Sequence, residues 1–122
     1  MSTPTELLKI GDFAKLAGTN LRTLRYYEEL ELLSPALRSD GGFRYYRPTD
    51  VHRVRMIHDL QELGLNLERI RALVDTKGEE NDRPAWIRRI HAALSEQREL
   101  IEGRVRTLEE QKDRIVQAQQ KL

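Results

Sequence analysis

Arginine is the residue type in this chain that most clearly indicates a binding function, because a guanidinium group binds phosphates and guanine through paired N–H donors. Residues 38–55 contain five arginines and only two aspartates. A second group, Arg22 and Arg25 beside Tyr26, lies upstream. The net charge of all 122 residues is only +1, so the positive charge is local. This distribution predicts one face that contacts phosphate groups.

Other chemistry has little support in the sequence. There is no cysteine, which excludes disulfides, thiol redox chemistry and thiolate metal sites. The three histidines are dispersed, and no carboxylate pair, activated nucleophile or phosphate loop stands out. We therefore expect no enzymatic activity, no metal, no cofactor and no response of this chain to small ligands. Since no apolar run is long enough for a membrane span and no signal peptide opens the chain, we expect a cytoplasmic protein without a membrane partner.

Two short helices are predicted to position the first group of arginines. After a flexible arm over residues 1–9, Gly11 can begin a helix that Gly18 ends. Asn20 is a typical N-cap for a second helix from Leu21 to about Leu30. Two short helices joined by Gly-Thr-Asn are typical of a helix-turn-helix. The residues expected to face the core are Phe13, Leu16, Ala17, Leu21 and Leu24.

A hairpin and two further helices are predicted to complete this domain, which we place at residues 10–76. Residues 37–46 have strand-forming side chains around Asp-Gly-Gly, which is typical of a tight turn. By the two-residue period of a strand, we expect Phe43 and Tyr45 to pack inward and Arg44 and Tyr46 to face outward. Pro48 is expected to begin a helix to Leu63, and Asn66 to cap the next. Their predicted buried residues are Val51, Val54, Ile57, Leu60, Leu67, Ile70, Leu73 and Val74.

Beyond a predicted linker at 77–83, residues 84–122 have the pattern of one long helix. Six apolar residues recur every seven positions: Ile87, Leu94, Ile101, Leu108, Ile115 and Leu122. This spacing is typical of a coiled-coil seam, although the second seam position is partly polar. Nothing else in the chain is long enough to cover the stripe, so we expect a second copy as partner. The predicted dimer interface consists of Ile87, Ile90, Leu94, Ile101, Val105, Leu108 and Ile115.

Four sequence blocks resemble the DNA-binding domain of the MerR family of bacterial transcription regulators. They are residues 10–15 (IGDFAK), 23–28 (TLRYYE), 42–46 (GFRYY) and 62–70 (ELGLNLERI), in the family's order and spacing. The resemblance implies a mainly α fold: a winged helix-turn-helix of four helices and a small β-hairpin wing, then a long helix in an antiparallel coiled-coil dimer. Such a homodimer binds a pseudo-palindromic promoter and distorts the DNA, and thereby affects RNA polymerase indirectly at the nucleoid. Arg47 and Arg69 depart from the family's usual residues, and the cysteines of many family sensors are missing.

The candidate DNA contacts combine residue type with this resemblance. The recognition helix should lie in the major groove, and Arg44 and Tyr46 are similar to the family's pair that grips the DNA backbone. Tyr27 is either a contact or a core residue, and Asn66 either binds a phosphate or only caps its helix. The wing residues also fit a hairpin held by aromatic packing. The full set is Arg22, Thr23, Arg25, Tyr26, Tyr27, Arg38, Arg44, Tyr46, Arg53 and Asn66.

Two other classes of protein stay open. A chaperone-modulator protein has a MerR-like helical domain that binds a co-chaperone, but it would not need Arg25, Tyr26, Arg44 and Tyr46 together on one face. A DNA-bending architectural or excision factor would share the domain but would need no long dimerisation helix. Trp86 is a candidate for a ligand-binding role. Because it lies at the start of the long helix, we expect it instead to pack against the DNA-binding domain.

Overall fold

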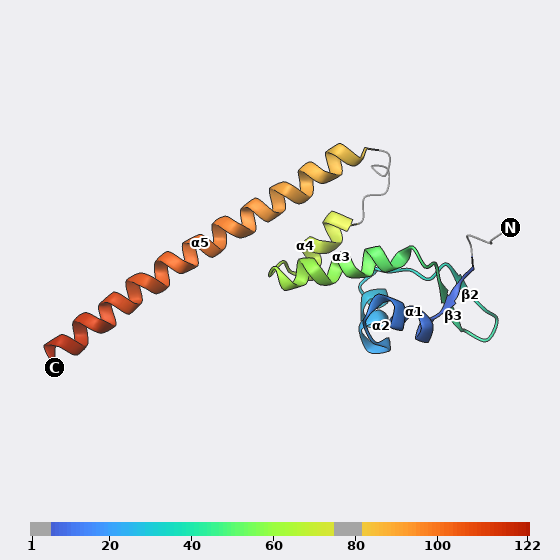
Figure 1. The fold of residues 1–122 in the computed structure, drawn as a ribbon, viewed down its shortest axis with the longest axis horizontal. Helices are drawn as coiled ribbons and strands as arrows, with labels where there is room; N and C mark the ends of the chain where they lie inside the picture. Colours follow the sequence, from blue (N-terminus) through green and yellow to red (C-terminus); the bar gives the residue numbers. More distant parts are fainter. Residues whose placement is uncertain (1–5, 75–81) are drawn as a thin grey trace. The chain divides into compact units, whose positions relative to one another are not determined.

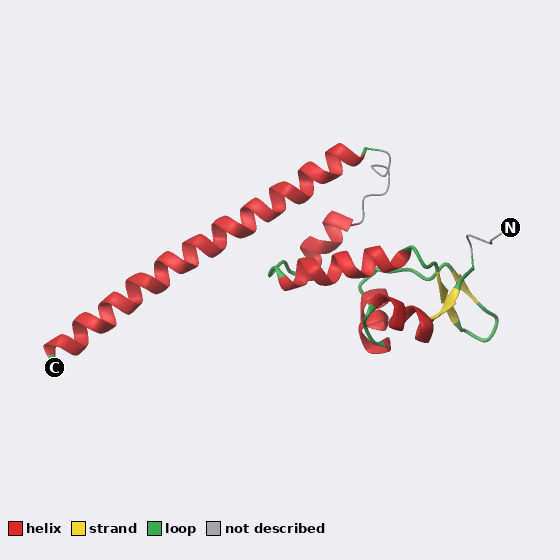
Figure 2. Cartoon of the chain, viewed as in Figure 1, coloured by secondary structure: helices red, strands yellow, loops and turns green. Residues whose placement is uncertain are grey.

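The computed structural model describes residues 6–74 and 82–122, and the chain divides into two compact units, Met1–Thr76 and Lys77–Leu122. We call the first unit the head. Within the described residues the head has four helices and three short strands, and the second unit is one long helix (Figure 1). Helices dominate both units (Figure 2), as the sequence predicts.

The helix-turn-helix consists of α1 (Ile10–Ala17) and α2 (Leu21–Glu29). Gly18 ends α1 in the left-handed conformation, with φ of 71°, where a side chain would be strained. The carboxamide of Asn20 then begins α2, since its oxygen accepts a hydrogen bond from the Thr23 backbone N–H at 2.8 Å. Both predicted helix-end signals are confirmed.

The three strands form one antiparallel sheet, β1 (Leu8–Lys9), β2 (Leu37–Arg38) and β3 (Arg44–Tyr46), in the order β1-β3-β2. The predicted hairpin is confirmed, and we call residues 37–46 the wing. In its turn Gly42 has a φ of 82° and donates to the Ser39 carbonyl at 2.9 Å. Strand β1 was not predicted: the expectation of a flexible arm over residues 1–9 is wrong for Leu8 and Lys9, which pair with Tyr46 and Tyr45.

Two further helices complete the head, α3 (Asp50–Glu62) and α4 (Leu67–Val74). The first begins two residues after the predicted Pro48, because Pro48 and Thr49 form a turn and the Asp50 carboxylate accepts from the Arg47 N–H at 3.2 Å. The predicted buried residues of the two helices are confirmed except Leu67, which is half-buried: Val51, Val54, Ile57, Leu60, Ile70, Leu73 and Val74 are buried.

The core of the head lies between α1, α2, α3, α4 and the sheet. The fully buried ring of Tyr46 stacks on Phe13 of α1, with ring centroids 4.6 Å apart and planes inclined by 13°. The expectation that Leu16 and Leu21 face this core is wrong, because both are exposed. At 3.6 residues per turn, Phe13, Ala14 and Ala17 occupy one side of α1, and Leu16 falls outside that arc.

The second unit is α5 (Arg83–Lys121), an unbroken helix. Asp82 caps it by accepting from the Ala85 N–H at 3.1 Å, so the helix begins one residue before the predicted Pro84. Residues 77–81 of the predicted linker lie outside the described residues. The exposed large apolar residues of α5 are Ile87, Leu100, Ile101, Val105, Leu108, Ile115 and Val116, and Leu122 just beyond its end is also exposed.

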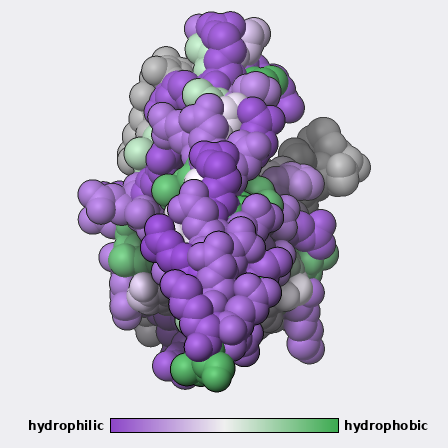
Figure 3. Space-filling model, turned by 90° about the vertical axis from the view of Figure 1, so that its left-hand side faces the viewer, coloured by the Kyte–Doolittle hydropathy of each residue, from purple (hydrophilic) through white to green (hydrophobic). Residues whose placement is uncertain are grey.

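These apolar residues follow one another along α5 among charged neighbours. On the face drawn in Figure 3, hydrophilic residues predominate and hydrophobic ones lie in small, separate groups. Within the part of the chain that the structure describes, no helix is both long enough and apolar enough to cross a membrane. The long helix α5 is therefore amphipathic and not uniformly apolar.

Candidate nucleic-acid interface

The outer side of α2 presents a group of exposed polar side chains. Leu24 and Tyr27 are buried on the inner side. At 3.6 residues per turn, Arg22, Arg25 and Tyr26 point to the opposite side, together with Glu29. Arg22, Arg25, Tyr26 and Glu29 are exposed and Thr23 is half-buried. The helix thus turns two guanidinium groups and one phenol outward.

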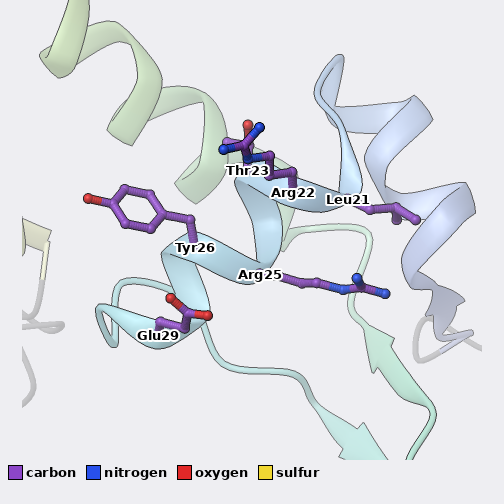
Figure 4. A pocket seen from close by; sticks show the side chains of 6 residues that line it. All are labelled: Leu21, Arg22, Thr23, Arg25, Tyr26 and Glu29. Atoms are coloured by element: carbon purple, nitrogen blue, oxygen red, sulfur yellow. The ribbon is translucent and has the colours of Figure 1, made fainter.

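A shallow hollow of about 700 Å³ follows this surface of α2. It is lined by Leu21, Arg22, Thr23, Arg25, Tyr26 and Glu29. In the view of Figure 4, Arg25 and Tyr26 extend from α2 in opposite directions. The four candidate DNA contacts on α2 thus line one hollow on the outer side of the helix.

Arg38 and Arg44 of the wing form hydrogen bonds with Glu28 of α2, a residue that is not among the predicted DNA contacts. Its Oε1 accepts from Arg44 Nε at 2.9 Å and from an Nη2 group of Arg38 at 3.3 Å. The Glu28 side chain is only 8% exposed, whereas those of Arg44 and Arg38 are 33% and 60% exposed. The carboxylate is thus inside and the guanidinium groups reach outward. No local sequence signal marks this role of Glu28, because its partners lie 10 or more residues away in the chain.

Tyr46 also bonds to Glu28, which differs from the predicted wing geometry. Its hydroxyl donates to Glu28 Oε2, and burial, the hydrogen bond and the charge of Glu28 raise the pKa of Tyr46 well above its ordinary value. Phe43, expected to pack inward, is instead 69% exposed. The alternation along the strand is as predicted, but the face that turns inward is the one with Tyr46. The structure therefore does not present Tyr46 to a ligand.

Tyr27 adopts the core position that the sequence left as one of two alternatives. Its side chain is buried, and its hydroxyl donates to Gln61 Oε1 at 2.6 Å. Burial raises the pKa of Tyr27 above its usual value. The phenol thus links α2 to α3 and is not on the accessible surface.

Two other candidates also have contacts inside the head. Arg53 donates from Nε to the Leu32 carbonyl at 2.6 Å and from Nη1 to the Val74 carbonyl at 3.3 Å. Asn66 caps α4, since its side-chain oxygen accepts from the Arg69 N–H at 2.8 Å, which confirms the cap. A role of Asn66 or Arg53 toward DNA stays a prediction.

A second hollow, of about 430 Å³, lies where α2 meets the wing. It is lined by Arg25, Glu28, Glu29, Arg38 and Arg44. Three arginines from three separate elements converge there, one each from α2, β2 and β3. Such a convergence suits an anion with several oxygen acceptors, such as a phosphate group. Among the described residues, no group of three or more histidines or carboxylates has the arrangement of a metal site.

Comparison with known proteins gives matches over both units. The model of the MerR HTH family regulatory protein matches residues 8–77, and the MerR, DNA binding model matches residues 51–118. Each match spans more than half of the chain.

Two curated relatives show the same similarity. The HTH-type transcriptional regulator ZntR of Escherichia coli is 37% identical over 71 residues, which are 58% of this chain and 50% of ZntR. The HTH-type transcriptional activator TipA of Streptomyces coelicolor is 35% identical over 109 residues, 89% of this chain and 40% of TipA. The chain thus spans about half the length, or less, of these curated relatives.

A solved structure covers both units. It is MtaN, the N-terminus of the Bacillus subtilis multidrug transporter activator, with 28% sequence identity and a TM-score of 0.72. The match covers 91% of this chain and 96% of MtaN. The helix-turn-helix, the wing and the long helix therefore occur together in a related protein. On the two family matches, this chain belongs to the MerR family of regulatory proteins.

Proposed function

We propose that this chain is a sequence-specific transcription regulator that binds double-stranded promoter DNA through α2 and the wing. The observation that carries the proposal is the convergence of Arg25, Arg38 and Arg44 on one hollow beside the exposed surface of α2. Phosphate contacts fix a protein on the duplex, and side chains on an exposed helix read base edges. The head has both kinds of group on adjoining surfaces.

In this proposal α2 enters the major groove, and the wing grips the flanking backbone. Arg22, Thr23, Arg25 and Tyr26 are the candidates for base and phosphate contacts from α2. Arginine pairs with guanine through two hydrogen bonds, and a phenol ring packs on a thymine methyl or bonds to a phosphate. Arg38 and Arg44 add charge at the wing without reading sequence. Tyr27 and Tyr46 act from inside, by holding the surface in shape, and Arg53 and Asn66 remain candidates for a phosphate contact.

We further propose a homodimer that binds two half-sites of a pseudo-palindromic operator. The exposed apolar residues of α5 support a helical partner, and a second copy supplies one with the same pattern. Half-sites about one helical turn apart, or a multiple of it, follow from two-fold symmetry. Distortion of the bound promoter would then control how RNA polymerase engages it in the cytoplasm, at the nucleoid.

The names of the relatives support this function over its rivals. ZntR and TipA are described as a transcriptional regulator and a transcriptional activator. A chaperone modulator has no use for two arginines and a tyrosine exposed on α2 beside a basic wing. An architectural factor has no use for the apolar residues of α5. Neither rival is favoured by a contact among the residues of the head that the structure describes.

The decisive experiment is selection of duplexes from a random-sequence pool by the whole chain, in excess competitor DNA. We expect enrichment of a two-fold symmetric sequence. Arg25→Ala should then relax or weaken that selection, whereas Arg98→Ala, a matched change on α5, should leave it intact. Recovery of random sequences, or of no duplex, would contradict sequence-specific binding. Transcription from a promoter that contains the selected site separates a regulator from an architectural protein.

A further inference from the structure

Glu28 joins α2 to both strands of the wing. Its two carboxylate oxygens accept from Arg44 on β3, from Arg38 on β2 and from the Tyr46 hydroxyl on β3. With its side chain 8% exposed, Glu28 is nearly excluded from water. A buried carboxylate is costly unless several donors satisfy it, and here three do. The wing is therefore tied to α2 through one charged group.

The bond to Tyr46 gives this link a rigid base. Tyr46 is fully buried and stacks on Phe13 of α1. Arg44 and Tyr46 are two residues apart on β3, so both side chains lie on the same face of the strand. Glu28 thus bonds to a group anchored in the core and to a group that reaches the surface. The position of Arg44 is set by the core through Glu28.

The guanidinium groups keep donors for a second acceptor. Each guanidinium has five N–H donors, and the bonds to Glu28 involve Nε of Arg44 and Nη2 of Arg38. Both arginines line the hollow that they share with Arg25. A guanidinium that is held by a carboxylate loses less conformational freedom when it binds an anion.

We propose that Glu28 is a positioning residue that aims Arg38 and Arg44 at one phosphate group of bound DNA, in the hollow shared with Arg25. This inference rests on the proposed function, because the phosphate belongs to the DNA. Glu28 itself need not touch the nucleic acid. It contributes by fixing where two positive charges stand relative to α2, and hence the register between the wing and the groove-reading helix.

The direction of the effect separates this role from simple electrostatics. Glu28 is negative and lies beside the proposed phosphate, so its charge alone weakens DNA binding. If charge were its only effect, removal of the carboxylate would tighten binding. If Glu28 positions the arginines, its removal weakens binding although the surface becomes more positive. The two accounts predict opposite signs.

The test compares Glu28→Ala with Glu29→Ala in the whole chain, on a duplex that the wild-type chain retains from a random-sequence pool. Both variants remove one negative charge from adjacent positions of α2, but Glu29 is exposed. We expect Glu28→Ala to weaken DNA binding about tenfold. The slope of log affinity against log salt should also shrink by about one unit, which corresponds to the loss of one phosphate contact. Glu29→Ala should tighten binding. Equal affinities of the two variants would overturn the proposal.

A double-mutant cycle guards against a general loss of structure. Arg44→Ala is expected to weaken binding about tenfold in the wild-type background, but less than twofold when Glu28 is already alanine, because the arginine is then no longer aimed. Additive effects would overturn the positioning role. Glu28→Gln keeps the side-chain length and one acceptor oxygen, and the same cycle is run on it if the alanine variant does not fold.

Amide hydrogen exchange in the free chain separates the two proposals. In the absence of DNA, Glu28→Ala should speed exchange in residues 37–46 while α3 keeps its protection. If the wild-type chain retains no duplex, the proposed function fails and the phosphate role of Glu28 fails with it. Faster exchange would then still support the link between wing and α2. Unchanged exchange in the wing would overturn that link, even for a chain that binds DNA.

Discussion

The head and α5 differ in how far their apolar residues are exposed to solvent. Within the described residues, the head buries Phe13, Leu24, Tyr46 and Ile57 almost completely against its own elements. Along α5, by contrast, Ile101, Leu108 and Ile115 are exposed in the single chain, and Ala93 alone is buried. The head therefore obtains its stability within one chain. Most helical stability in proteins comes from packing of an apolar face, so we expect the stability of α5 to depend on a partner helix and on protein concentration.

The two units also use arginine differently. In the head, Arg38 and Arg44 converge on one nearly buried carboxylate. On α5, Arg98 pairs with Glu102 one turn along at 4.0 Å, and both side chains are exposed. Exposed pairs of this kind contribute little to stability and mainly keep a helix solvated. The same residue type thus builds a site in one unit and a charged surface in the other.

The largest expected effect is loss of the head's core. Phe13→Ala removes a fully buried ring that stacks on Tyr46, and such changes cost about 3–5 kcal/mol of the free energy of unfolding. Leu16→Ala on the same helix, at a residue 48% exposed, should cost less than about 1 kcal/mol. All four tyrosines lie in the head, so near-ultraviolet tyrosine signals during thermal unfolding report on it. Similar losses in the two variants would mean that the core lies elsewhere.

Next in size is the effect of a charge in the seam of α5. Leu108→Asp would bury a carboxylate in an apolar interface, at a cost of several kcal/mol, and should yield a monomer with a folded head. Gln117→Asp introduces the same charge nine residues on, which is the opposite side of the helix. Sedimentation at micromolar concentration measures both, and the control should stay dimeric. A dimer of unchanged affinity in Leu108→Asp would place the seam on another face.

A smaller effect is expected from the wing. Arg44→Ala should weaken binding to specific and non-specific duplexes alike, about tenfold, because we propose that the guanidinium contacts a phosphate and no base. The slope of log affinity against log salt should shrink by about one unit. Arg98→Ala removes an equal charge from α5, and we expect an unchanged slope. If Arg44→Ala instead changed which sequence is selected, the wing would be reading bases.

The smallest effect concerns pH. The pKa values of Tyr27 and Tyr46 are raised above the ordinary value of 10.0 in the folded head. The unfolded chain therefore loses these protons first, so the stability that they contribute is intact below pH 10 and is lost as pH rises above it. The slope is at most about 1.4 kcal/mol per pH unit for each tyrosine. Tyr46→Phe should flatten the fall in melting temperature of the head between pH 9 and 11. An equally steep fall in that variant would assign the loss to other groups.

Much of the site could be predicted because its signals are local. Asn20 and Asn66 cap their helices with side-chain hydrogen bonds to residues three positions away, a geometry that the sequence alone specifies. The exposure of Arg22, Arg25 and Tyr26 also follows from the helical period once Leu24 is assigned to the core. The role of Glu28 could not be predicted, because its partners are 10, 16 and 18 residues away and reach it only when the wing folds back on α2.

Local signals in the sequence were enough to predict the heptads of α5, the caps of α2 and α4, and the glycine turn of the wing. These features depend on the dihedral angles and side chains of near neighbours. Which face of β3 turns inward depends instead on long-range packing within the head. The two-residue period correctly groups Arg44 with Tyr46, but either face of an isolated hairpin could be covered. Tyr46 is stabilised on the inside by the ring of Phe13 from α1 and the carboxylate of Glu28 from α2, and Phe43 is left exposed.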